Sequence, residues 1–146
     1  NLHMNGTDLF NFTISDVPRA IEDFWAKTGT GADDYDRYVL HQANRFIHQQ
    51  LSRKLSIPFE KMPLSLDRFG NTSAASIPLT LSDHYGEQTQ GSENVLMSGF
   101  GVGLSWGVVS AIIDAANVFP VIVTDDYFAE GIINGPEDMG AAQGSE

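Results

Sequence analysis

The sequence predicts an α/β fold in which helices are layered on a mixed sheet that ends in an antiparallel pair of strands. Short apolar runs of strand length alternate with longer segments of helical periodicity. The last two apolar runs, residues 94–97 and 104–113, are separated only by the glycine-rich residues 99–103, and so short a connection joins antiparallel neighbours. Hydrophobic residues make up 42 % of the 146 residues, which is enough for a core.

The first half of the chain supplies two helical regions and a strand. Residues 8–14 and 16–28 are predicted as two helices, or as one helix kinked at Pro18. Residues 36–40 form a short buried strand, after which Asn44 is expected to cap a helix. The apolar stripe expected on the inner face of that helix consists of Phe46, Ile47, Leu51 and Leu55.

The second half begins with extended residues 63–66 and a turn at residues 70–73. A helix over residues 74–85 is expected to pack closely through Ala74, Ala75 and Ser76, and a polar loop follows it. We therefore divide the chain into a folded domain, residues 1–113, and an acidic extension, residues 114–146. Within the extension we expect one more extended segment at residues 119–123 and a loosely held end at residues 135–146.

Composition excludes several classes of function. A net charge of −11 argues against a nucleic-acid-binding protein, and no apolar run has the length of a membrane span. The spacings of the four histidines do not match a metal site, and the chain has no cysteine, so we expect a cytoplasmic enzyme without a metal. Because residue 1 is asparagine, we expect the chain to be a piece of a longer protein.

Positive charge is concentrated in one stretch of this acidic chain. Residues 37–68 carry six bases against two acids, whereas residues 69–146 carry ten acids and no base. Such a stretch is either a docking site for an acidic partner or a phosphate, or the solvated face of a helix.

His41 and Asn71 are the residues that most directly indicate chemistry. His41 follows an apolar strand, and Asn71 lies in a turn next to Gly70. Taken singly, each has an ordinary structural explanation as a core histidine and a turn residue. Together they can donate two N–H groups to one carbonyl oxygen, although chemistry of that kind usually also uses a thiol nucleophile, which this chain lacks.

Three motifs carry a family resemblance. They are residues 41–44 (HQAN), residues 67–78 (DRFGNTSAASIP) and residues 99–107 (GFGVGLSWG). In order and approximate spacing they resemble the C-terminal half of a β-ketoacyl-acyl-carrier-protein synthase III, and the resemblance covers about residues 2–113. It implies part of a thiolase-like fold that lacks its N-terminal partner half, and a Cys-His-Asn triad to which this chain contributes His41 and Asn71.

The resemblance also implies a reaction. In that family a cysteine of the N-terminal half takes an acyl group from acyl-CoA. The histidine and asparagine then hold the thioester carbonyl of malonyl-carrier protein and stabilise the enolate that forms as carbon dioxide leaves. No cofactor is implied beyond the CoA thioester and the carrier protein's phosphopantetheine, which are substrates, and without a cysteine this chain alone is expected to be inactive.

Two further groups of residues follow from the resemblance. The active-site loop, which would supply oxyanion-hole N–H groups, consists of Phe100, Gly101, Val102 and Gly103; many family members carry glycine where this chain has Val102. The residues implied to dock acyl carrier protein are Arg45, Arg53 and Lys54, with Phe46 in the place of the usual arginine. Acyl-CoA and a homodimer of the full-length enzyme complete the implied partners, and neither nucleic acid nor membrane is among them.

Two alternatives remain. One is a synthase-III-like acyltransferase of a specialised pathway that makes a polysaccharide-linked or secondary-metabolite acyl group. The other is a non-catalytic acyl-binding or dimerisation subunit that supports a cysteine-bearing partner. Truncation explains the missing cysteine better than a partner subunit does, because a partner subunit has no need to keep both His41 and Asn71.

Overall fold

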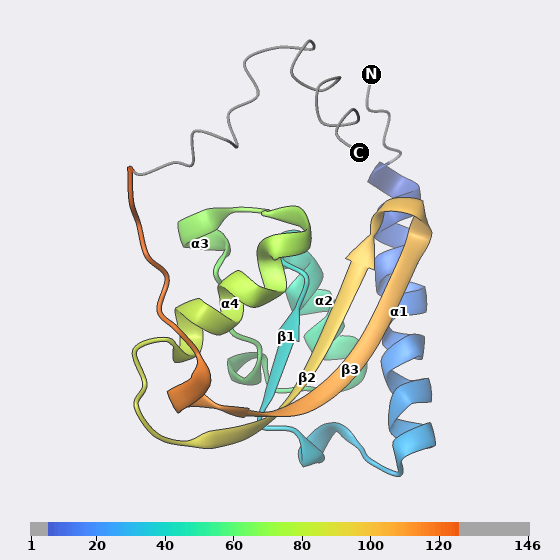
Figure 1. Ribbon diagram of the computed structural model, residues 1–146. Coiled ribbons are helices and arrows are strands. Elements are labelled where there is room, and N and C mark those ends of the chain that lie inside the picture. The colour runs from blue at the N-terminus through green and yellow to red at the C-terminus, as the bar shows by residue number, and fades with distance from the viewer. Residues whose placement is uncertain (1–5, 126–146) are drawn as a thin grey trace, which may run out of the picture.

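A three-stranded mixed sheet lies at the centre of the fold (Figure 1). In this computed structural model, which describes residues 6–125, the strands are β1 (Arg37–Leu40), β2 (Ser92–Gly101) and β3 (Ser105–Asp114). Their order is β1-β2-β3, with β1 parallel and β3 antiparallel to β2. The predicted α/β class and the antiparallel final pair are therefore confirmed.

Helices cover both faces of the sheet (Figure 1). The α-helices are α1 (Gly6–Thr28), α2 (Arg45–Leu55), α3 (Leu66–Phe69) and α4 (Ser76–Tyr85). Short 3-10 turns lie at η1 (Ala32–Asp34), η2 (Phe59–Lys61), η3 (Ser73–Ala75), η4 (Val102–Leu104) and η5 (Ala115–Asn117). None of the helices within residues 6–125 is long and apolar enough to cross a lipid bilayer.

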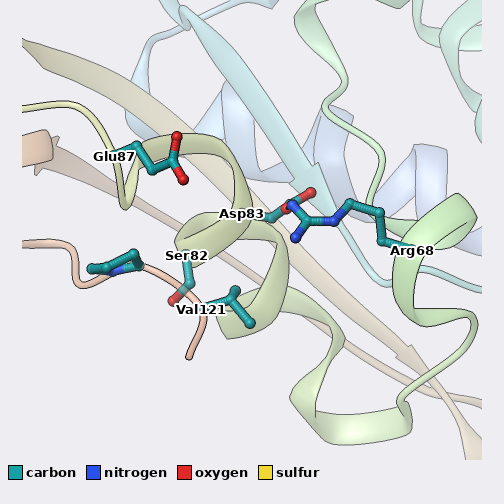
Figure 2. Close-up of a pocket in the computed structure, with 6 residues that line it drawn as sticks. Arg68, Ser82, Asp83, Glu87 and Val121 are labelled. Carbon is teal, nitrogen blue, oxygen red and sulfur yellow. The ribbon is translucent and has the colours of Figure 1, made fainter. Parts of the chain in front are cut away.

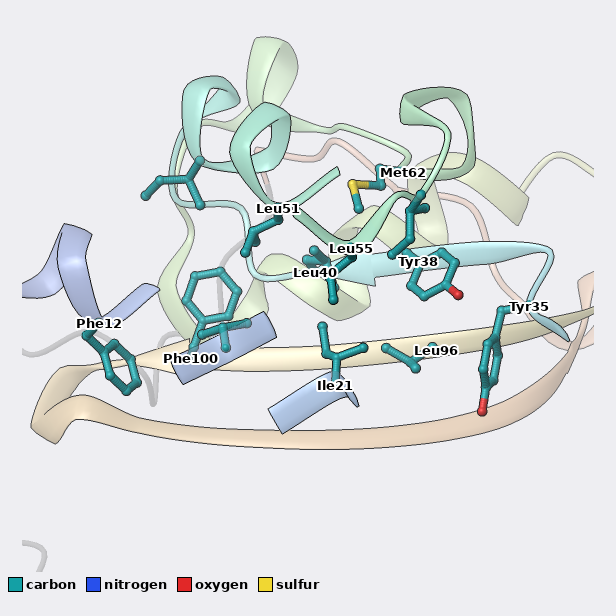
Figure 3. Packing of buried hydrophobic residues seen from close by; sticks show 13 residues of the cluster. Phe12, Ile21, Tyr35, Tyr38, Leu40, Leu51, Leu55, Met62, Leu96 and Phe100 are labelled. Carbon is teal, nitrogen blue, oxygen red and sulfur yellow. The ribbon is translucent and has the colours of Figure 1, made fainter. Parts of the chain in front are cut away.

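Alternation along the strands divides the core between the two faces. Tyr38, Leu40, Leu96 and Phe100 pack with residues of α1 and α2 in the larger cluster, shown in Figure 3. Val39 points to the opposite face and packs with Val95, Tyr85 and Ala115 in a smaller cluster beside α4. Successive side chains of a strand point to opposite faces, so each strand serves both clusters.

Residues 6–28 form one helix, the second of the two alternatives that the sequence left open. Pro18 lies inside it and is buried. Proline has no N–H to donate to the carbonyl four residues earlier, which here is Ile14. The Lys54 ammonium donates to that Ile14 oxygen at 2.8 Å, so a side chain of α2 replaces the missing helical hydrogen bond.

Helix α2 begins as predicted but turns a different face inward. Asn44 caps it, since its Oδ1 accepts the N–H of Ile47 at 2.9 Å. Phe46, however, is 54 % exposed and stacks on Phe10 of α1, so its predicted place in the inner stripe is wrong. The inward face instead carries Ile47, His48, Leu51, Ser52 and Leu55. Helical period alone could not separate Phe46 from Ile47 at the start of the stripe.

The segment before α4 also differs from expectation. The predicted helix starts at Ser76, and the preceding η3 turn leaves Ala74 and Ala75 exposed, so the close packing expected through the two alanines is wrong. Ser76 alone of the three is buried. Of these small residues, only Ser76 therefore packs in the interior at the start of α4.

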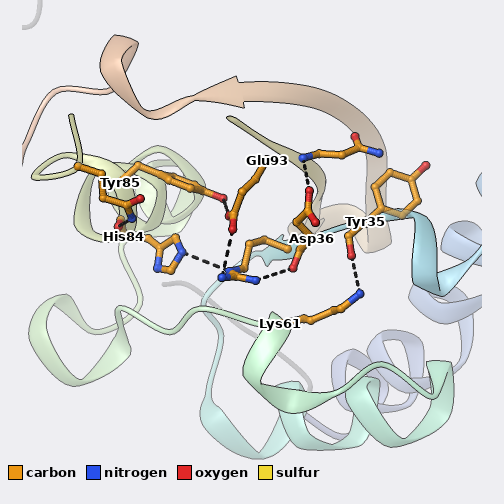
Figure 4. A network of polar contacts seen from close by, with 9 residues as sticks. Tyr35, Asp36, Lys61, His84, Tyr85 and Glu93 are labelled. Atoms are coloured by element: carbon orange, nitrogen blue, oxygen red, sulfur yellow. Dashed lines mark hydrogen bonds and ion pairs between the residues drawn. The ribbon is translucent and has the colours of Figure 1, made fainter. Parts of the chain in front are cut away.

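The ends of the sheet opposite His41 are held by a polar network (Figure 4). Arg37 forms an ion pair with Glu93 at 3.1 Å, and its Nε donates to His84 Nε2 at 3.3 Å. The Tyr85 hydroxyl donates to the other oxygen of Glu93 at 2.6 Å. These contacts join β1, β2 and the end of α4, leaving the opposite end of β1 to the candidate site.

The chain after β3 folds back over α4. Pro120 packs so closely on Gly86 that a side chain at that glycine would collide with the proline backbone. Next to this contact lies a cavity of about 110 Å³, shown in Figure 2 and lined by Arg68, Ser82, Asp83, Glu87, Pro120 and Val121. Residues 118–124 run without regular secondary structure, and the predicted loosely held end, residues 135–146, lies outside the described residues.

Candidate active site

His41 lies one residue beyond the end of β1 and is half-buried. Its backbone N–H donates to the carbonyl of Ser98 at 2.9 Å, which continues the pairing with β2 by one residue. Phe100, two residues along β2, makes a T-shaped contact with the imidazole, with ring centroids 5.3 Å apart. Strand pairing and an aromatic wall thus fix where the imidazole stands.

Asn71 stands in an exposed turn between α3 and η3. Its Oδ1 accepts the N–H of Ser73 at 2.9 Å, which is an Asx turn. Ser73 itself has a left-handed backbone with φ 51°, a conformation that costs free energy for a residue other than glycine. Because the carboxamide oxygen is held by the turn, the Nδ2 group is the part of Asn71 that remains available to donate.

A chain of hydrogen bonds connects the two predicted catalytic residues. His41 Nδ1 lies 2.8 Å from Ser76 Oγ, and Ser76 Oγ lies 2.9 Å from the carbonyl oxygen of Ser73. Ser73 in turn donates its N–H to Asn71. The structure therefore brings His41 and Asn71 into one network through Ser76 and Ser73, two residues to which sequence reasoning gave no catalytic part.

The surroundings of His41 favour a neutral ring. Burial lowers the pKa of His41 below its usual range, and a hydrogen bond with the backbone of Ser73 opposes that shift. A neutral imidazole carries its single proton on one nitrogen only. With Nδ1 beside Ser76, Nε2 is the nitrogen available to a substrate.

A second, fully buried network lies behind His41. The Gln42 side-chain amide donates to the Leu40 carbonyl at 2.9 Å and lies 3.2 Å from His48 Nε2, while its Oε1 accepts the Ser65 N–H at 3.1 Å. His48 Nδ1 lies 3.2 Å from the Asn44 carbonyl oxygen. Sequence reasoning missed this network, because the only signal was a glutamine next to the histidine and a second histidine seven residues later.

Stability is expected to fall as the pH drops from about 7.5 to 5.5, because His48 is held neutral in the folded chain. Burial lowers the pKa of His48, so the unfolded chain binds its proton more readily. Protons bound only on unfolding favour the unfolded state, and the slope is at most about 1.4 kcal/mol per pH unit for each such histidine.

Denaturant titrations across this range, on the chain and on His48→Gln, measure the effect. Burial also lowers the pKa of His41 and of His84, so the variant should keep a slope of the same sign that is smaller in magnitude. An unchanged slope in His48→Gln would show that His48 does not titrate with unfolding.

The predicted active-site loop forms the hairpin between β2 and β3. Phe100 and Gly101 end β2, and Val102 and Gly103 belong to the η4 turn. Gly103 and Leu104 have left-handed φ values of 77° and 52°. Phe100 is both a member of the core cluster and a neighbour of His41, so packing in the core does not remove it from the candidate site.

The predicted docking residues lie on or beside α2, but two of them have intramolecular partners. Arg45 forms a long ion pair with Asp67 at 3.7 Å, and both side chains are mostly exposed. Lys54 donates to Ile14. Arg53 lines a cavity of about 240 Å³ together with Gln49, Ser52 and Phe59. All three bases are exposed on α2, and one of them, Lys54, is hydrogen-bonded to α1.

Neither of the two cavities contains His41 or Asn71 among its lining residues. Within residues 6–125, no three His, Asp or Glu side chains are grouped closely enough to hold a metal ion. What the described site offers is thus a set of hydrogen-bond donors and acceptors, which suits a carbonyl oxygen better than a cation.

Comparison with known proteins gives one consistent family. The sequence profile of the 3-oxoacyl-[acyl-carrier-protein (ACP)] synthase III C-terminal family matches residues 25–113. The β-ketoacyl-[acyl-carrier-protein] synthase III of Streptococcus pyogenes serotype M5 is 42 % identical over 109 residues, which are 73 % of this chain and 34 % of the streptococcal protein. The chain thus spans about a third of the length of the curated relatives it matches.

Solved structures agree with the sequence comparison. A 3-oxoacyl-(acyl-carrier protein) synthase from Burkholderia xenovorans superposes with a TM-score of 0.77 at 34 % identity, covering 83 % of this chain and 35 % of that one. A priming β-ketosynthase of the R1128 polyketide pathway superposes with a TM-score of 0.68 at 29 % identity, covering 81 % and 34 %. The predicted partial thiolase-like fold is therefore confirmed.

Proposed function

Because this chain belongs to the C-terminal family of 3-oxoacyl-[acyl-carrier-protein] synthase III, we propose that it is the decarboxylating part of a Claisen-condensing enzyme. The whole enzyme joins an acyl group from acyl-CoA to malonyl-carrier protein and releases free CoA, carbon dioxide and a β-ketoacyl-carrier protein. The observation that supports this proposal most strongly is the hydrogen-bonded chain from His41 through Ser76 and Ser73 to Asn71.

The proposed chemistry is stabilisation of negative charge on one oxygen. Loss of carbon dioxide from a malonyl thioester leaves an enolate, whose oxygen carries the charge. An N–H of His41 and the Nδ2 group of Asn71 are the two donors for that oxygen, and each such donor contributes roughly 2.7–4 kcal/mol in comparable sites. The carbanion then attacks an acyl thioester on a cysteine, which this chain does not contain.

Labelling with acyl-CoA tests whether acylation belongs to the cysteine-bearing half and decarboxylation to this chain. The purified 146-residue chain has no thiol and should retain no label from radioactive acyl-CoA. A protein in which this chain is joined to the cysteine-bearing half should form an acyl-enzyme and release carbon dioxide from malonyl-carrier protein. Condensation by the 146-residue chain alone, or an acylated joined protein that never decarboxylates malonate, would contradict the proposal.

Acyl carrier protein is the proposed macromolecular partner, and the exposed bases of α2 are its proposed contact. Arg53→Glu in the joined enzyme should raise the Michaelis constant for malonyl-carrier protein and leave acylation by acyl-CoA unchanged. The reason is that malonyl-carrier protein docks on the charged surface of α2 as a protein, whereas acyl-CoA is a small molecule. Arg19→Glu, the same change at an exposed position on α1, is the control. Equal Michaelis constants for the two variants would remove Arg53 from the docking surface.

Lys54 needs separate treatment in that experiment. Changing Lys54 to glutamate together with Arg53 should raise the Michaelis constant further, but it also removes the hydrogen bond to Ile14. Full-length homodimerisation and a cytoplasmic location are further parts of the proposal and rest on the family alone.

Priming of a polyketide pathway is a second candidate. The structure of the R1128 priming β-ketosynthase superposes on this chain with a TM-score of 0.68, within the range of the synthase III structures. The chemistry at His41 and Asn71 is the same in both candidates. Acyl-CoA preference of the joined enzyme separates them.

A further inference from the structure

We propose that Ser76 is a positioning residue that decides which nitrogen of the His41 ring carries the proton, and so whether His41 presents a donor or an acceptor to a substrate. The inference rests on the proposed function, in which His41 must donate to a carbonyl oxygen. Ser76 does not touch that oxygen; it acts only through the imidazole.

The Ser76 hydroxyl has one proton and two neighbours that can accept it. One is His41 Nδ1 at 2.8 Å, and the other is the carbonyl oxygen of Ser73 at 2.9 Å. If the hydroxyl donates to Nδ1, the proton of the neutral ring is on Nε2, and Nε2 is a donor. If the hydroxyl donates to Ser73, Nδ1 carries the ring proton and Nε2 has a lone pair.

If a carbonyl oxygen, rather than a hydroxyl, were bonded to Nδ1, only the ring with its proton on Nδ1 would be allowed. The carbonyl oxygen of Ser73, 2.9 Å from the Ser76 hydroxyl that contacts Nδ1, lies on the Nδ1 side of the ring. A carbonyl oxygen can only accept, so if this carbonyl takes the place of a removed hydroxyl, the ring proton is favoured on Nδ1 and Nε2 has no hydrogen to donate. Ser76 is the group at this nitrogen that can donate as well as accept.

Ser76 is held rigidly enough for this role. The residue is 1 % exposed, and its carbonyl accepts the Thr80 hydroxyl at 2.8 Å. Thr80 Oγ1 lies 2.7 Å from Ser65 Oγ, and Ser65 donates its N–H to Gln42, the neighbour of His41 in sequence. The buried contacts thus form a closed ring from His41 through α4 and back to the end of β1.

Nitrogen NMR of the full chain tests the inference without any substrate. Long-range proton–nitrogen correlation spectra of the ¹⁵N-labelled chain distinguish the two tautomers of His41 at neutral pH. In Ser76→Ala the ratio of Nε2–H to Nδ1–H ring should fall roughly fivefold, the effect of one net hydrogen bond. Ser76→Thr, which keeps the hydroxyl, should restore the ratio.

Ser82→Ala is the matched control, because it makes the same change on the same helix at a residue that lines the cavity beside Pro120. It should change the tautomer ratio little. If Ser76→Ala does not fold, Ser76→Cys gives the same comparison, since a thiol fills nearly the same volume and is a weak hydrogen-bonding group.

Two results would overturn the inference: a ratio in the Ser76→Ala or Ser76→Cys chain equal to that of the unchanged chain, or an equal shift in Ser82→Ala. The proposed function fails differently. A joined enzyme that does not decarboxylate malonate, while the tautomer responds to Ser76 as expected, would refute the function and leave the positioning role. An active joined enzyme in which the His41 tautomer ratio does not change with Ser76 would refute the positioning role and leave the proposed function.

Discussion

Replacing Asn71 with alanine in the joined enzyme is expected to lower the rate of malonyl decarboxylation by roughly two to three orders of magnitude. Acylation of the cysteine by acyl-CoA should remain near its original rate, because that step does not form the malonyl enolate. The carboxamide oxygen is already bound to the Ser73 N–H at 2.9 Å, so the group lost to the reaction is the Nδ2 donor. Release of labelled carbon dioxide and single-turnover acylation measure the two steps separately.

Asn71→Asp separates the reaction from the turn. An aspartate keeps an oxygen that can accept the Ser73 N–H, so the Asx turn survives, but it has no N–H to offer and adds a negative charge beside an enolate. It should decarboxylate no faster than the alanine variant. An aspartate variant with nearly full activity would mean that Asn71 serves the turn only.

Gln42→Leu is expected to destabilise the chain by roughly 2–4 kcal/mol, although leucine is similar in size to glutamine. The buried amide satisfies the Leu40 carbonyl, His48 Nε2 and the Ser65 N–H, and leucine would leave all three without this partner. Unsatisfied buried polar groups cost free energy that a good apolar fit does not offset. Urea unfolding at pH 7.5 gives the free energy directly.

Gln88→Leu is the control for this change. The Gln88 side chain is exposed and donates to the nearby carbonyl of His84, where water can take its place. Its replacement should alter the free energy of unfolding by less than about 0.5 kcal/mol. If the two leucine variants unfold at the same urea concentration, the buried network does not contribute to stability in the way that its contacts indicate.

Local patterns predicted the places of single residues well. Strand length placed His41 at the end of β1, and the capping preference of asparagine placed Asn44 at the start of α2. A glycine beside Asn71 correctly indicated a turn. Each of these depends on neighbours within a few positions, which a single sequence displays.

Contacts between distant residues could not be predicted in this way. Gln42 and Ser65 are 23 positions apart, and His41 and Ser76 are 35 apart, so no periodicity joins them. Burial of a glutamine and of a histidine also contradicts the general preference of polar residues for the surface. Likewise, nothing in the sequence pairs Lys54 with Ile14, 40 positions earlier.

If the proposed docking of a carrier protein on α2 uses Lys54, that docking is coupled to the stability of α1. The Lys54 ammonium completes α1 at the carbonyl that Pro18 leaves without a donor. A carrier protein that draws this ammonium to its own carboxylates must first take it from the helix, so whatever free energy the bond gives to α1 is subtracted from docking. Reciprocity requires the converse to the same amount: a bound carrier protein would loosen α1 at Pro18, and a helix made firmer there would bind its partner more weakly.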